Sequence, residues 1–195
     1  MLSILLVRPG ATDFDDQRRI KGSLDMPLSE CGRQQVRRTA QDVATFQLQA
    51  VYSAPCESAL TTSAELIAGR DIRVKAIPNF RNIDHGLWHG KLVDDVRRQQ
   101  PRLYRQGEEY PNLICPPEGE TVEEAKQRVF KALRKVIKKH RDGAIALVIP
   151  DPLASVVHCI LSGEGPKSLW LSEVDTGNWE LIELESLELR EPALV

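Results

Sequence analysis

Long hydrophobic runs, paired cysteines and an excess of charge of one sign are all scarce in this 195-residue sequence. The apolar run Leu2–Val7 has six residues, which is too short for the core of a signal peptide and far too short to span a bilayer. The 26 Lys and Arg residues nearly balance the 28 Asp and Glu residues, giving a net charge of -2. A membrane protein and a dedicated nucleic-acid binder are therefore not expected.

The four cysteines are widely separated and form no C-x-x-C pair. This pattern predicts neither a zinc site nor a disulfide framework, and we expect no metal and no cofactor. Scattered thiols suit a reducing cytoplasm, where they act as small packing residues. The cysteines are Cys31, Cys56, Cys115 and Cys159.

Apolar segments rich in Leu, Ile and Val alternate with amphipathic segments along the chain. The expected strands are residues 2–7 and 144–149, which should be central, residues 50–53 and 72–77, and residues 178–184, a late strand at the sheet edge. The expected helices are residues 30–46, 56–68, 93–100 and 122–140 and a segment after Pro152. Such alternation predicts an α/β fold, a three-layer α/β/α sandwich with a mostly parallel central sheet. The length fits a single domain over residues 1–195, with a lid or insertion at about 91–117.

Two loops at the expected carboxyl ends of strands are where catalytic groups should lie in such a sheet. The first, after Val7, contains Arg8, Gly10 and Thr12, where the glycine permits close backbone approach and the threonine offers a hydrogen bond. The second loop, after Ile149, contains one carboxylate, Asp151, between two prolines.

The motifs of the chain resemble those of the histidine phosphatase superfamily, also called phosphoglycerate mutase-like proteins. That family opens with a strand ending in Arg-His-Gly-Glu-Thr, and residues 8–12 here read Arg-Pro-Gly-Ala-Thr. Residues 19–35 follow its next signature at fixed spacing, with Lys21 in place of a glutamine. Further matches keep the family's order at residues 52–62, 83–90 and 117–121. The resemblance implies the phosphoglycerate mutase-like version of the sandwich.

The departures from the family pattern fall on the chemical groups. Pro9 stands where the family has its nucleophilic histidine, and Pro150 stands where it has a second active-site histidine. Ser58 replaces a phosphate-binding arginine, Asn82 replaces the acidic proton donor, and Asp15 aligns with a pocket asparagine. Of the family's core phosphate-binding set, the resemblance leaves only Arg8.

These replacements exclude catalysis through a phosphohistidine, because proline has no nucleophilic side chain and loss of the nucleophile alone can cost on the order of 10⁶ in rate. We therefore expect no catalytic residue and a vestigial pocket. Its members are Arg8, Pro9, Gly10, Thr12, Asp15, Ser58, Asn82, Pro150 and Asp151.

The leading functional hypothesis is a pseudophosphatase, a binding, scaffolding or regulatory protein whose partner is a protein or a small anionic ligand, and which forms a homodimer. A first alternative is a phosphatase or other hydrolase that acts on a small phosphorylated substrate through a rewired site using Asp15, Asp151, His85 or a metal. A second alternative is a phospho-ligand sensor that uses Arg8 and Thr12 without turnover.

The carboxylates near the first loop suggest how the pocket is filled. We expect Asp151 or Asp15 to pair with Arg8 as a built-in anion. Asp151 should also cap the following helix, with Pro152 as its first residue, because Asp is a preferred N-cap and Pro a preferred first helical residue.

Several other residues have two readings. His85 and His89 are spaced as ligands on a helix would be, but Gly86 and Gly90 argue against a helix and against a metal site. His140 is expected to cap the preceding helix, and His158 to be structural. Trp88, Trp170 and Trp179 are packing residues or a ligand surface, with Trp88 the best functional candidate. The basic run Lys135–Arg141 is either a solvated helix end or a phosphate or RNA patch.

Overall fold

The computed structural model describes residues 1–110, 115–163, 176–184, 186 and 189. Within these residues the chain forms one five-stranded sheet, in the order β3-β2-β4-β1-β5. Strands β1 to β4 run parallel and β5 runs antiparallel to β1. The strands are β1 (Leu2–Val7), β2 (Leu48–Ser53), β3 (Val74–Ala76), β4 (Gly143–Val148) and β5 (Trp179–Leu184).

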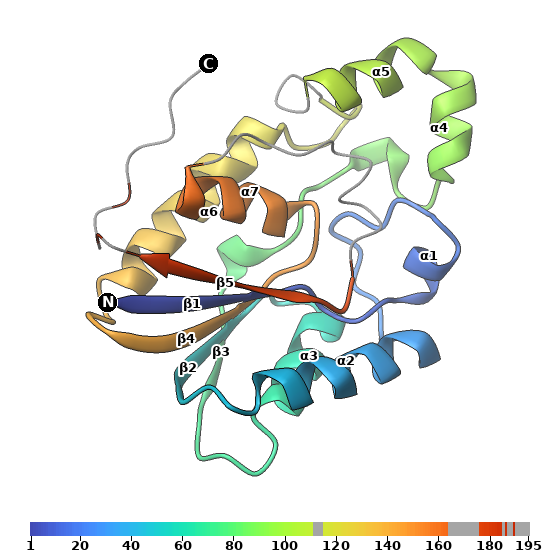
Figure 1. The fold of residues 1–195 in the computed structure, drawn as a ribbon. Helices are drawn as coiled ribbons and strands as arrows, with labels where there is room; N and C mark the ends of the chain where they lie inside the picture. Colours follow the sequence, from blue (N-terminus) through green and yellow to red (C-terminus); the bar gives the residue numbers. More distant parts are fainter. Residues whose placement is uncertain (111–114, 164–175, 185, 187–188, 190–195) are drawn as a thin grey trace.

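Helices cover both faces of this sheet, so the predicted three-layer α/β/α architecture is confirmed. Figure 1 shows α2 and α3 on one face and α6 and α7 on the other. The helices are α1 (Asp13–Asp16), α2 (Glu30–Val43), α3 (Glu57–Leu66), α4 (Val93–Gln99), α5 (Pro101–Glu109), α6 (Val122–Ile137) and α7 (Leu153–Ser162). Two 3₁₀ turns, η1 (Pro78–Phe80) and η2 (Gly86–Trp88), lie between β3 and α4. In the described part of the chain, no helix is long and apolar enough to cross a membrane.

The central strands are buried as their composition predicts. In β1, five of six residues are fully buried, and β4 is buried from Ile145 to Val148. Apolar side chains at nearly every position suit a strand that is covered on both faces. The edge strand β3 is shorter than the predicted 72–77, because it pairs on one side only, with β2, over three residues.

Two helix starts follow the capping residues seen in the sequence. The Ser29 hydroxyl accepts a hydrogen bond from the Gly32 amide at the start of α2. Thr121 and Glu124 form a reciprocal capping box at the start of α6, with the Thr121 amide donating to the Glu124 carboxylate at 2.9 Å. These contacts satisfy backbone amides that have no partner within the helix.

The segment predicted as a lid or insertion contains two helices rather than the single helix expected at 93–100. Helix α5 was missed because Pro101 reads as a helix breaker, although proline is favourable at the first helical position, where it stands. Val96 of α4 packs with Ile20 and Trp88 in a small cluster apart from the main core. Trp88 is fully buried there, so its role is packing rather than the exposed ligand contact that was its functional reading.

Candidate functional site

Three neighbouring strands bring the site together at one edge of the sheet. Strands β1 and β4 are parallel and in register, so the residues that follow Val7 and Val148 emerge side by side. Strand β5 is antiparallel to β1 with Trp179 opposite Val7, so it begins where β1 ends. Arg8, Asp151 and Glu180 therefore meet, although 172 residues separate the first from the last.

Arg8 is buried and is held by two carboxylates. Its Nε donates to Oδ2 of Asp151 in an ion pair whose side chains are 4% and 2% exposed. Its Nη1 lies 2.9 Å from Oε1 of Glu180 and 3.4 Å from the Asn178 side-chain oxygen. The expected pairing of Arg8 with Asp151 is thus present, and Glu180 adds a second negative charge.

Asp151 also binds the start of α7. Its Oδ1 accepts the Ser155 amide at 2.8 Å and the Ser155 hydroxyl at 2.7 Å. Burial raises the pKa of the Asp151 carboxyl, while Arg8 and the Ser155 donors act to lower it. Because both oxygens accept hydrogen bonds, the geometry is that of an ionised carboxylate. Helix α7 begins one residue later than predicted, with Pro152 as its N-cap, but Asp151 still satisfies a first-turn amide.

Asn82 connects the Asp151 loop to two other segments. Its amide nitrogen donates to the backbone oxygens of Asp151 at 2.6 Å and Gly22 at 3.0 Å. Its side-chain oxygen accepts from the amides of Ile83 at 2.9 Å and Leu153 at 3.2 Å. The two hydrogen bonds that the Asn82 amide nitrogen donates require an amide, since an ionised carboxylate has no donor.

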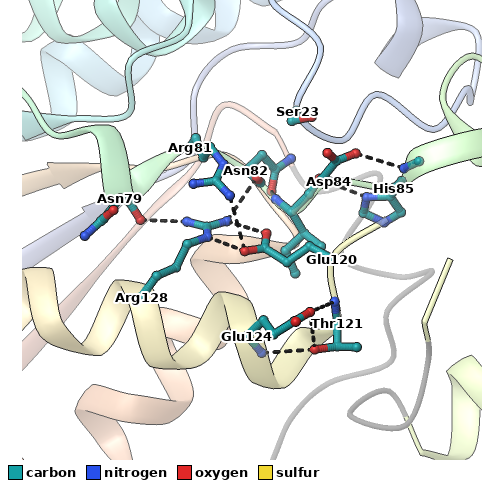
Figure 2. A network of polar contacts seen from close by, with 12 residues as sticks. Ser23, Asn79, Arg81, Asn82, Asp84, His85, Glu120, Thr121, Glu124 and Arg128 are labelled. Carbon is teal, nitrogen blue, oxygen red and sulfur yellow. Dashed lines mark hydrogen bonds and ion pairs between the residues drawn. The ribbon is translucent and has the colours of Figure 1, made fainter. Parts of the chain in front are cut away.

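Arg128 of α6 binds the backbone of the segment that carries Asn82, as Figure 2 shows. It donates to the backbone oxygens of Asn79 at 2.7 Å and Asn82 at 3.1 Å. It also forms a two-pronged ion pair with Glu120, at 2.6 and 2.8 Å. Arg81, next to Asn82, lies 3.5 Å from the same carboxylate. The bidentate contact with Glu120 holds the guanidinium in place, and the same guanidinium binds two backbone oxygens of the segment that carries Asn82.

Asp15 does not reach Arg8, which corrects the second half of the expected pairing. Its carboxylate lies 2.7 Å from the ammonium of Lys21, and the two side chains are 6% and 7% exposed. It also accepts the Thr12 amide at 2.7 Å and the Thr12 hydroxyl at 2.8 Å. Thr12, predicted as a ligand donor, is thus used to hold Asp15.

The remaining predicted pocket residues serve local packing. Pro9 and Pro150 are buried, and their backbone oxygens accept from Gly177 at 2.7 Å and Ala154 at 3.0 Å. Ser58 is buried in α3. Gly10 is needed for its predicted close approach, but to α2 rather than to a ligand, because a Cβ there would lie 2.4 Å from the Gly32 oxygen.

The histidines form no recognisable catalytic or metal-binding set. His85 is buried with Nδ1 3.1 Å from the Ile83 oxygen, and His89 Nε2 lies 3.7 Å from Asp84. No group of three His, Cys, Asp or Glu side chains suited to a metal occurs among the residues that the structure describes. His158 lies 2.8 Å from Glu180. At the end of α6, the His140 backbone amide donates to the Ile137 oxygen at 3.0 Å, as the expected capping role requires, while its ring contacts Tyr52 and Gln49.

Sequence reasoning missed Asn178 and Glu180. The strand that carries them was expected at the sheet edge, but its direction was not, and only an antiparallel strand begins beside Arg8. The signal in the sequence that could have identified the site was the carboxylate of Glu180, near the start of that strand. Trp170, the other candidate aromatic, lies outside the described residues.

Comparison with known proteins assigns this chain to a family. The model of the histidine phosphatase superfamily (branch 1) matches residues 4–191. The chain is 28% identical to phosphoserine phosphatase 1 of Hydrogenobacter thermophilus over 185 residues, covering 95% of this chain and 88% of the relative. It is 30% identical to a probable phosphoglycerate mutase GpmB of an Enterobacter species over 168 residues, covering 83% and 74%.

Solved structures agree with the fold. YhfR of Bacillus stearothermophilus superposes with a TM-score of 0.83 at 25% identity, covering 97% of this chain and 95% of that one. A vanadate (VO3) complex of the mycobacterial glucosyl-3-phosphoglycerate phosphatase Rv2419c superposes with a TM-score of 0.80 at 20% identity, covering 92% and 91%. The family match and the shared architecture together establish that this chain belongs to the histidine phosphatase superfamily, branch 1.

Proposed function

We propose that this protein is a catalytically inactive histidine phosphatase homologue that acts by binding, as a scaffold or regulator. Pro9 and Pro150 occupy the positions of the family's two active-site histidines and supply neither a nucleophile nor a base. Ser58 and Asn82 occupy the positions of a phosphate-binding arginine and a proton donor. Phosphoryl transfer through an enzyme histidine has no group left to perform it.

One observation carries the proposal: Arg8, the remaining phosphate-binding residue of the pattern, is already neutralised by Asp151 and Glu180. These carboxylates act as a built-in anion. A phosphate dianion approaching Arg8 would meet both, and each like-charge pair at about 4 Å costs up to roughly 4 kcal/mol at an effective dielectric near 20. Anion binding at Arg8 is therefore opposed from within the protein.

Asn82 supports the same conclusion independently. Its amide nitrogen donates to two backbone oxygens. A carboxylic acid in a proton-donating enzyme must be able to exchange its proton with the substrate, whereas this side chain is committed to the loops around it. Asn82 therefore serves to hold these loops together in this chain.

The first experiment measures hydrolysis of an aryl phosphate and a panel of phosphorylated metabolites by the purified protein, with and without divalent metals. We expect no turnover. A comparison variant combines Pro9→His, Ser58→Arg, Asn82→Glu and Pro150→His, which restores the family's groups. A second variant adds Asp151→Gly and Glu180→Gln, because restored histidines would still face an Arg8 occupied by carboxylates.

We expect turnover to appear only when the carboxylates are also removed, in variants whose circular dichroism and cooperative unfolding show a folded chain. Phosphatase activity that copurifies with the unmodified protein, and that is lost on a point change beside Arg8, would overturn the proposal.

A second candidate, a phosphatase with a rewired site, is favoured by the names of the relatives, which include a phosphoserine phosphatase. The groups available to it are Asp15, Asp151 and His85, of which the two carboxylates are ion-paired. Metal-dependent turnover that is abolished by His85→Asn would support this candidate.

The binding role implies an occupant, which we propose to be a protein partner or a small anionic ligand in the cytoplasm. A homodimer is a further part of the proposal. Sedimentation of the purified chain tests the homodimer. Affinity capture tests the occupant, with the Asp151→Gly, Glu180→Gln variant as the comparison.

A further inference from the structure

A cavity of about 290 Å³ lies away from Arg8, between the C-terminal half of α6 and the edge strand β3. Its volume is near the lower end of the range for small-molecule sites, roughly 300–1,000 Å³. Its walls include Tyr52 of β2, Lys75 of β3, three residues of α6 and Lys139, which lies just beyond the end of α6.

The register of the sheet and the period of the helix bring these residues together. Tyr52 and Lys75 are direct partners on neighbouring parallel strands, so their side chains leave the same face of the sheet. Ala132, Lys135 and Val136 stand at positions i, i+3 and i+4, one stripe of α6, and Lys139 follows in the turn after the helix. The α6 stripe therefore faces the Tyr52–Lys75 pair across the cavity.

The charge of this cavity has one sign. Lys75, Lys135 and Lys139 line it, and none of its lining residues is acidic. Among the described residues, none of these three lysines makes an ion pair. Several like charges around one concavity raise the local positive potential and the local concentration of anions.

Part of the wall is apolar. Ala132 and Val136 are buried on α6, and Ile77 and Pro78 also line the cavity. The ring of Tyr52 is buried, and its hydroxyl lies 2.8 Å from Nε2 of His140. A ligand that fits must therefore combine a multiply charged anion with a compact apolar body.

We propose that this cavity binds a small organic phosphate monoester, with the phosphate dianion between the lysines and the carbon body on the Ala132 and Val136 wall. A dianion suits three ammonium groups better than a single carboxylate does. The site is separate from Arg8 and does not depend on the absence of catalysis. It also gives the basic run Lys135–Arg141 a use beyond a solvated helix end.

The test uses the full chain, uniformly labelled with ¹⁵N, and three probes. Phenyl phosphate carries both the dianion and the apolar body, inorganic phosphate carries the anion alone, and phenol carries the body alone. We expect saturable amide shifts at Ala76 and Val136 with phenyl phosphate, binding about tenfold weaker with inorganic phosphate, and none with phenol.

A pair of double variants locates the site. Lys75→Gln with Lys135→Gln removes two cavity charges, and Lys131→Gln with Lys138→Gln removes two exposed charges of the same helix end that do not line the cavity. We expect the first pair to weaken phenyl phosphate binding by about tenfold or more and the second pair to leave it within about twofold.

Three results would overturn the proposal: no saturable binding, equal weakening by both double variants, or equal binding of phenyl phosphate and inorganic phosphate. Shifts confined to amides beside Arg8, such as that of Ser155, would also overturn it and would count against the built-in anion as well. Shifts at the cavity alone leave the proposed lack of catalysis unaffected.

Discussion

At the scale of single residues, the buried charges near the end of β1 occur as complementary pairs. Asp151 contacts Arg8, and Asp15 contacts Lys21. All four side chains are nearly fully buried. A buried charge is costly without a partner, so each member of a pair makes the other tolerable. The site is polar and charged, and its charges are satisfied internally.

Removal of the Asp151 charge tests the larger of these contacts. Asp151→Asn keeps the shape of the side chain but removes the carboxylate charge that Arg8 Nε binds, and loss of one partner of a buried pair typically costs about 3–5 kcal/mol. We expect a loss of about 3 kcal/mol in the free energy of unfolding, measured by urea denaturation. Asp16→Asn, at an exposed carboxylate, should change it by less than about 0.5 kcal/mol. Equal effects of the two changes would contradict the assignment.

A double-mutant cycle tests the Asp15–Lys21 contact. Asp15→Asn strands a buried ammonium and Lys21→Met strands a buried carboxylate, so each single change should destabilise the protein. The double variant leaves no buried charge at this pair. We expect its loss in free energy of unfolding to be smaller than the sum of the two single losses by about 1–3 kcal/mol. Urea denaturation of all four proteins gives this coupling energy. Additive losses would show that the ion pair contributes nothing.

At the scale of elements, α6 performs two tasks along its length. Its N-terminal half carries Arg128, which donates to the backbone of the Asn82 segment (Figure 2). Its C-terminal half carries Lys135 of the cavity, and Lys139 follows in the turn after the helix. The chain then turns through His140, whose ring contacts β2. Nε2 lies 2.8 Å from the Tyr52 hydroxyl, and Nδ1 lies 3.3 Å from the Gln49 side-chain oxygen. A neutral ring with its proton on Nδ1 fits both partners.

The His140 contact predicts a pH dependence of stability. Burial, with a smaller effect of Lys139, lowers the pKa of His140 below its ordinary value near 6.5. The unfolded chain therefore binds a proton at this ring before the folded protein does, so stability is present above about pH 6.5 and is lost as the pH falls toward the folded-state pKa. We expect the free energy of unfolding to fall more between about pH 7 and pH 5.5 in the unmodified protein than in His140→Gln.

The comparison needs only chemical denaturation at several pH values. Glutamine retains a polar group beside Tyr52 but does not titrate. Parallel pH profiles for the two proteins would show that His140 does not contribute.

At the scale of the whole molecule, the position of a strand decides what its side chains contribute. Leu5 of the inner strand β1 and Leu181 of β5 are paired in the sheet register. Leu5 is fully buried, whereas Leu181 is 43% exposed. The same residue type therefore lies in the core on one strand and at the surface on its neighbour.

Matched truncations measure this difference. Leu5→Ala should lower the free energy of unfolding by about 2–5 kcal/mol, because it leaves a cavity between packed layers. Leu181→Ala should cost under about 1 kcal/mol, since its side chain is partly solvated already. Thermal and urea denaturation distinguish the two, and similar losses would contradict the layered arrangement.

The sequence by itself determined the layers and the family. Apolar runs at residues 2–7 and 144–149 specified inner strands because only strands covered on both faces keep branched apolar residues at nearly every position. Ser29 and Thr121 specified helix starts because their hydroxyls accept from local amides. Fixed-spacing motifs marked the superfamily, since the spacing of residues along the chain does not depend on distant contacts.

Only the tertiary structure decided which charges meet. Asp15 and Asp151 were equal candidates for Arg8, and strand order settled the choice, because β4 lies beside β1 whereas Asp15 lies in α1 near Lys21. Glu180 joined Arg8 because β5 runs antiparallel, a direction that local sequence does not encode. The lysine-lined cavity arises where α6 passes the edge strand. These features depend on contacts between residues far apart in the chain, and local propensity and periodicity carry no information about such contacts.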